Sequence, residues 1–140
     1  MSSMSKSNLK EMDEEKEFGS QIMLVVGRAP KKNHDVTVQI FKQFKDMFKK
    51  HGGLRMEVFQ LNNTKTYEDM GLTNIVNTVS ANQDEEVWVE LQYYKDRKHM
   101  DEVIAKMGKD ESMGRLYKQS LDLLTPGTSF IIGEFGRFSV

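Results

Sequence analysis

The stretch EVWVELQYYKDRKHMDEVIAKM, residues 86–107, carries the clearest structural signal in this sequence. Its first nine residues alternate between two sets, as the side chains of a β-strand do. One set is Val87, Val89, Leu91 and Tyr93, and the other is Trp88, Glu90, Gln92 and Tyr94. After Asp96, a residue suited to cap a helix, the apolar residues recur at helical spacing. The stretch therefore predicts a strand that leads directly into a helix.

Further elements follow on both sides of this unit. Residues 21–27 (QIMLVVG) are apolar on both faces, which favours a central strand covered on both sides. Residues 34–51 carry an apolar stripe at helical spacing, and Gly52 and Gly53 end this helix. The remaining predictions are strands at residues 54–61 and 129–138, a weaker strand at 73–80, and a helix at 112–124.

This order of elements indicates an α+β fold, a ferredoxin-like split βαβ sandwich with one additional strand. Its helices can cover only one face of the sheet. We expect Trp88 and Phe59 to lie on the other face, together with half of the apolar first strand. Because such a face needs a cover, the sequence predicts a homodimer that buries it, which is the arrangement of a dimeric α/β barrel.

Length and composition narrow the class of protein. The 140 residues fit one domain, which we expect at residues 19–140, and the polar residues 1–18 are predicted to form a disordered tail. The formal net charge of −1 gives no general attraction to nucleic acid, and the longest apolar run, residues 22–26, is too short to span a membrane. The absence of cysteine excludes disulfides, and with no visible signal peptide we expect a cytoplasmic protein.

Histidine is the commonest metal ligand in proteins. The chain has three, His34, His51 and His99, and no two of them share the spacing of a helical metal pair. We therefore predict no metal and no cofactor. His99 lies in the first turn of its helix, at the border of the apolar stripe, and stays a candidate catalytic residue.

Polar residues that alternate with apolar ones on three strands form the most informative group. Glu90 and Glu134 are candidate catalytic residues, because a carboxyl group buried beside an indole ring can act as a general base on an enolisable or phenolic substrate. The candidate ligand-binding residues are Arg55, Glu57, Trp88, Gln92 and Tyr94. The alternative interpretation is that all these residues form an exposed rim with cross-strand salt bridges.

Residues 94–113, YKDRKHMDEVIAKMGKDESM, resemble the matching stretch of the YbaA-like proteins, an uncharacterised family (domain of unknown function 1428). The turn His51-Gly52-x-Leu54 and the stretch Gly127-…-Ile131-x-Gly133-x-Phe135 also fit this resemblance. It implies the dimeric α/β-barrel fold and no established activity. Other members of that superfamily include cofactor-free monooxygenases and ligand-sensing domains, but functions do not transfer by fold alone.

Two hypotheses about function remain after these observations. The favoured one is a non-enzymatic homodimer that binds a small apolar ligand or a protein partner, since no catalytic motif is present. The alternative is a small cofactor-free oxygenase or isomerase-like enzyme that acts on an apolar enolisable or aromatic substrate in the barrel cavity. Neither hypothesis requires nucleic acid or a membrane.

Overall fold

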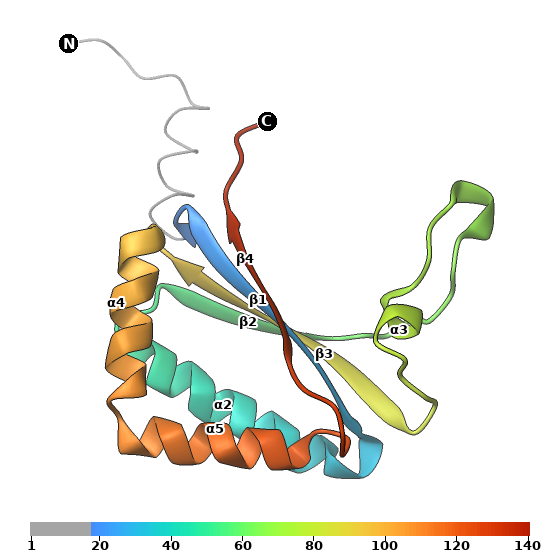
Figure 1. The fold of residues 1–140 in the computed structure, drawn as a ribbon, viewed down its shortest axis with the longest axis horizontal. Helices are drawn as coiled ribbons and strands as arrows, with labels where there is room; N and C mark the ends of the chain where they lie inside the picture. Colours follow the sequence, from blue (N-terminus) through green and yellow to red (C-terminus); the bar gives the residue numbers. More distant parts are fainter. Residues whose placement is uncertain (1–17) are drawn as a thin grey trace.

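A sheet and a layer of helices make up the computed structural model, which describes residues 18–140 (Figure 1). The elements are β1 (Gln21–Pro30), η1 (Lys31–Asn33), α2 (His34–Lys50), β2 (Arg55–Gln60), η2 (Glu68–Met70), α3 (Ile75–Thr78), β3 (Glu85–Tyr94), α4 (Arg97–Gly108), α5 (Glu111–Leu123) and β4 (Ile131–Gly136). The predicted tail lies outside the described residues except for Phe18, whose ring packs edge-on against Tyr93 at 5.4 Å between centroids.

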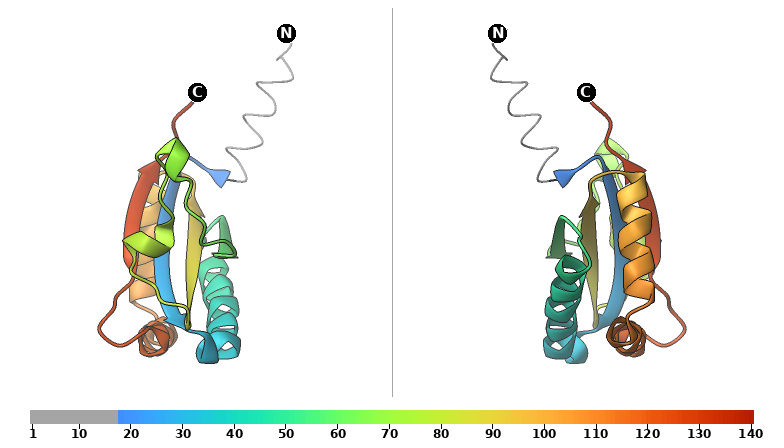
Figure 2. Two further views of the ribbon diagram at one scale, coloured as in Figure 1. Left: turned by 90° about the vertical axis from the view of Figure 1, so that its right-hand side faces the viewer. Right: turned by 90° about the vertical axis from the view of Figure 1, so that its left-hand side faces the viewer.

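The four strands pair antiparallel in the order β2-β3-β1-β4, with β1 and β3 in the centre. Helices α2, α4 and α5 lie on one side of this sheet, and the segment that contains α3 lies towards the other (Figure 1, Figure 2). The predicted α+β class with a ferredoxin-like order of strands is therefore confirmed. In the part of the chain described, no helix is long and apolar enough to cross a membrane.

The best-packed part of the core lies between the helices and the ends of β2 and β3. It consists of Phe48, Met56, Tyr94, Met100 and Val103. The rings of Phe48 and Tyr94 meet edge to face at 5.4 Å, a favoured geometry for aromatic pairs. The Asp96 carboxylate accepts a hydrogen bond from the His99 backbone N–H at 2.8 Å, so the predicted N-cap of α4 is present.

The second face of the sheet is free of α2, α4 and α5 and is largely apolar. Directly paired residues of an antiparallel sheet share a face, so the register assigns Leu24, Leu91 and Gly133 to it. The other apolar residues of this helix-free face are Ile22, Val26, Phe59, Val87, Val89, Tyr93, Ile131 and Phe135. Phe59, 49% exposed, lies where we expected it.

Trp88 lies on the opposite face from Phe59, and the prediction that the two share the helix-free face is wrong. Trp88 pairs with Gln60 and Gly27, and its ring packs against Phe41 of α2 at 5.4 Å between centroids. The alternating pattern separates the two sets of β3 side chains. It does not reveal which set meets the helices, because both contain large apolar residues.

The strand predicted at residues 73–80 is also wrong. This segment forms the short helix α3 within the loop between β2 and β3, and the Asn74 side chain accepts a hydrogen bond from the Val76 N–H at its start. The same side chain donates to the carbonyls of Asn63 and Lys65, which fixes the loop. The β-branched residues of this segment have no strand beside them to pair with, so their β-propensity is overridden.

Candidate functional site

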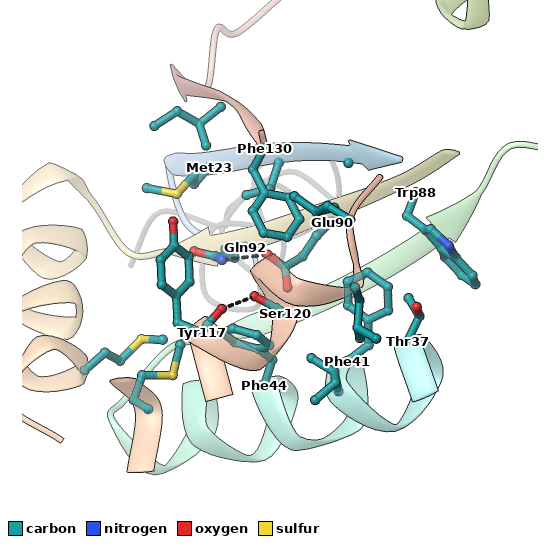
Figure 3. A pocket seen from close by; sticks show the side chains of 18 of the residues that line it. Met23, Thr37, Phe41, Phe44, Trp88, Glu90, Gln92, Tyr117, Ser120 and Phe130 are labelled. Atoms are coloured by element: carbon teal, nitrogen blue, oxygen red, sulfur yellow. Dashed lines mark hydrogen bonds between the residues drawn. The ribbon is translucent and has the colours of Figure 1, made fainter. Parts of the chain in front are cut away.

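A cavity of about 520 Å³ lies between the sheet and the helix layer of a single protomer (Figure 3). The sheet contributes side chains of β1 and β3 to its wall, and α2, α4 and α5 contribute the opposite side. Six aromatic side chains line it: Phe41, Phe44, Trp88, Tyr94, Tyr117 and Phe130. The helices and β1 present apolar side chains to this wall, and β3 adds its mixed face of Trp88, Glu90, Gln92 and Tyr94.

Glu90 is the acidic group of this wall. It is 8% exposed, and its carboxyl group points towards the middle of the cavity (Figure 3). The Gln92 Nε2 donates a hydrogen bond to Glu90 Oε2 at 2.8 Å, and the Tyr94 hydroxyl donates in turn to Gln92 Oε1. Burial raises the pKa of Glu90 because it disfavours the charged form, and the Gln92 hydrogen bond only partly opposes this shift.

Tyr94 closes this chain of hydrogen bonds at the end near the core. The residue is fully buried, and burial raises the pKa of its hydroxyl, with a further contribution from the negative charges of Glu90 and Glu134. Tyr94 therefore stays a neutral donor at physiological pH. Three consecutive residues on one face of β3 thus hold one carboxyl group in a fixed orientation.

Two polar atoms of the cavity wall lack a partner. Trp88 Nε1 and Thr37 Oγ1 are buried, and the structure gives neither a hydrogen-bond partner. Both residues lie at the same end of the cavity (Figure 3). A buried donor without an acceptor costs about 1–3 kcal/mol, so these two atoms retain hydrogen-bonding capacity at that end of the cavity.

The predicted polar group is divided between different surfaces. Trp88, Glu90, Gln92 and Tyr94 all line the cavity. Arg55 and Glu57 pair with Tyr93 and Leu91, so they lie on the helix-free face, where they form an ion pair at 3.6 Å. The expectation that all these residues share one face is therefore wrong, and Arg55 and Glu57 do not reach the cavity.

The other two catalytic candidates also lie outside the cavity. Glu134 is on the same face of the sheet as Glu90, but its side chain is 36% exposed and contacts Arg97 at 3.3 Å. His99 uses both ring nitrogens locally: Nδ1 accepts from the Lys95 backbone N–H, and Nε2 donates to the Gly52 carbonyl, each at 2.9 Å. His99 thus links the start of α4 to the turn after α2.

Several cavity residues were missed in the sequence because they come from helices. Thr37 on α2 and Ser120 on α5 interrupt the apolar stripes of their helices, and this interruption is the signal that could have marked them. Gly114 on α5 leaves open space, since a Cβ atom placed there would meet no atom within 4 Å.

Among residues 18–140, no three His, Asp or Glu side chains gather as metal ligands do.

Comparisons with known proteins agree with this fold. A family model described as a protein of unknown function (DUF1428) matches residues 21–123. No curated protein matches the sequence. Among solved structures, the chain is similar to SnoaB, a cofactor-independent oxygenase from Streptomyces nogalater, with a TM-score of 0.53 and 10% sequence identity over 87% of this chain and 97% of that chain. At this identity the likeness shows the fold alone, an antiparallel sheet covered by helices on one face.

Proposed function

We propose that this chain, which belongs to the DUF1428 family of proteins of unknown function, is a homodimer that binds one small, largely apolar molecule in the cavity of each protomer. The observation that carries this proposal is the cavity itself. Its volume of about 520 Å³ falls in the range of about 300–1,000 Å³ that is usual for small-molecule sites. Its wall is mostly apolar with a few convergent polar groups, which is the usual composition of such sites.

A small molecule is favoured over a protein partner for this site because the wall is concave. Protein interfaces bury broad surfaces of about 800 Å² on each partner, whereas Glu90 and Gln92 meet inside the concave wall of this cavity. The ligand site therefore belongs between the sheet and the helices of one protomer, and the interior of a two-subunit barrel is not needed to form it.

The homodimer is supported by the helix-free face. Leu24, Val89 and Leu91 lie at its centre and are only partly buried in one protomer. An apolar surface that stays partly exposed in one protomer usually marks an interface. A second copy of the chain is the simplest occupant, because it would offer the same apolar surface across a twofold axis.

A second candidate function is catalysis on the bound molecule, as in a small cofactor-free oxygenase or an isomerase-like enzyme. Glu90 favours it, because a buried carboxyl group in a cavity can exchange a proton with a ligand. The binding proposal does not depend on this second candidate.

The binding proposal can be tested with the neutral fluorescent probe N-phenyl-1-naphthylamine and a variant that fills the cavity. Gly114→Phe should place a ring in the open space above Gly114 and reduce probe affinity at least about tenfold, since a filled site excludes the ligand. The matched control, Gly114→Ala, adds one methyl group and should keep the affinity of the wild type. Equal affinity of all three proteins for the probe would disprove binding in this cavity.

A further inference from the structure

We propose that Glu90 is a catalytic base that moves a proton on an enolisable ketone bound in this cavity, with Trp88 and Thr37 as hydrogen-bond donors to the ketone oxygen. This inference rests on the proposed binding function and names the class of ligand and what happens to it. The proton transfer needs three things in one place: a free basic atom, donors for an oxygen that becomes negative, and a largely apolar wall around them.

The free basic atom is Glu90 Oε1. Gln92 Nε2 occupies Oε2, and among the described residues no hydrogen bond is made to Oε1. The carboxyl group extends from β3 towards α5, near Ser120 (Figure 3). Because Tyr94 and Gln92 fix one oxygen, the other is held ready for a ligand without reorganisation.

The surroundings of Glu90 make its carboxylate a stronger base than an exposed one. The other titratable side chains of the wall are Tyr94 from β3 and Tyr117 from α5, and no Lys, Arg or His lines the cavity in the described chain. Without a nearby cation, burial raises the pKa of Glu90. A carboxylate with a raised pKa takes a proton from a weak carbon acid more readily.

The donors are the two unpartnered atoms of the wall, Trp88 Nε1 and Thr37 Oγ1. Trp88 lies two residues before Glu90 on the same face of β3, a spacing of roughly 6.6 Å along a strand. A ketone oxygen placed at the Trp88 end therefore leaves its neighbouring carbon on the side of Glu90. The indole N–H can only donate, so it favours the oxygen most when that oxygen carries negative charge.

The reaction that follows balances without any further reactant. Glu90 Oε1 accepts the proton of the carbon next to the carbonyl, and the electron pair of the broken C–H bond moves to form the C=C bond. The C=O π electrons move to the oxygen, which Trp88 and Thr37 stabilise as an enolate. Glu90 then returns the proton to this oxygen or to another carbon of the enolate, which yields a tautomer or an isomer and restores the carboxylate.

The wall also restricts the class of ketone. Six aromatic rings favour flat, apolar molecules. The lining residues include no cation, so a substrate carboxylate or phosphate would be buried without a counter-charge, which is strongly unfavourable. Neutral aryl or polycyclic ketones fit these conditions, and organic acids do not.

The test uses 2-tetralone, a neutral bicyclic ketone, as the probe. Exchange of its most acidic carbon-bound protons with D₂O is followed by NMR, and its affinity is measured separately by titration. The wild-type protein should accelerate exchange, and Glu90→Gln should reduce that acceleration about 10²–10⁴-fold with an affinity near that of the wild type. Trp88→Phe keeps a ring and removes the N–H donor. This variant should reduce the acceleration of exchange about tenfold or more.

The control variant Glu102→Gln removes an exposed carboxylate on α4. It should accelerate exchange of the ketone protons as much as the wild type does. The base acts in its ionised form and its pKa is raised. The exchange rate should therefore keep rising at pH values above those at which an exposed carboxyl group is fully ionised. The wild type could bind 2-tetralone without accelerating exchange, or Glu90→Gln could accelerate exchange as much as the wild type. Either result would show that proton transfer by Glu90 is wrong, and ligand binding would still stand. If neither 2-tetralone nor the naphthylamine probe binds, the proposed function fails as well.

Discussion

Single residues show where the sequence was informative about this site. The alternation in residues 86–94 correctly groups Trp88, Glu90, Gln92 and Tyr94 on one face, because a strand has a period of two. It does not assign Arg55 and Glu57, whose face depends on the register between β2 and β3. A shift of one residue reverses every side chain, and this register exists only in the folded sheet.

Glu90→Gln gives a prediction about stability at the same scale. Folding favours the neutral form of Glu90, because its pKa is raised by burial. The stability that the neutral Glu90 carboxyl group contributes is therefore fully present below the usual pKa of a glutamate, near 4.3. It is lost as the pH rises through the raised pKa of Glu90 in the folded protein. The variant should thus melt several degrees above the wild type at about pH 8 and show a smaller difference at about pH 5.

Circular dichroism melts of both proteins across this range give the measurement. The exposed Glu102→Gln variant should follow the wild type at every pH. A Glu90→Gln variant that is less stable than the wild type at high pH would contradict a carboxyl group destabilised by its surroundings.

At the scale of elements, periodic segments were predicted well and the connection between β2 and β3 was not. The helix at 34–51 and the strands around residues 21–27, 54–61 and 86–94 all occur close to their predicted bounds. Each has an apolar face long enough to be distinctive. The strand prediction for residues 73–80 failed because the helix there depends on hydrogen bonds of the Asn74 side chain, including one to a loop carbonyl, that the local sequence pattern does not show.

Helix α5 should become more stable when Gly114 is replaced by alanine. Glycine in the interior of a helix costs about 1 kcal/mol relative to alanine, and the added Cβ atom would meet nothing within 4 Å. We expect the melting temperature to rise by roughly 2–6 °C for a domain of this size. Gly71→Ala is the contrasting control, because Gly71 has φ +70° and should lose stability. A Gly114→Ala variant that melts below the wild type would show that the glycine fits a neighbour.

For the whole molecule, the sequence predicted that a face of the sheet needs a cover but named one wrong residue for it. Trp88 belongs to the cavity, and the helix-free face is instead formed by aliphatic and aromatic side chains around Leu24 and Leu91. The order of elements fixes how many faces remain open. The identity of the residues on each face depends on the three-dimensional packing.

Leu24→Asp should therefore separate the proposed dimer. A charge at the centre of an apolar interface is buried without a partner and costs several kcal/mol for each protomer. Static light scattering at micromolar concentration should give twice the 16.2 kDa chain mass for the wild type and the chain mass itself for the variant. Val36→Asp, at an exposed position in the first turn of α2, should leave the dimer intact. A monomeric wild type would refute the dimer.

The alternation along β1 and β3 has a consequence for how members of this family can diverge. Met23 faces the cavity, and its neighbour Leu24 faces away from the helices. Substitutions at every second residue can therefore reshape the cavity while the helix-free face stays the same. If the proposed ligand site and dimer hold, specificity can drift on one side of a single sheet while selection maintains assembly on the other.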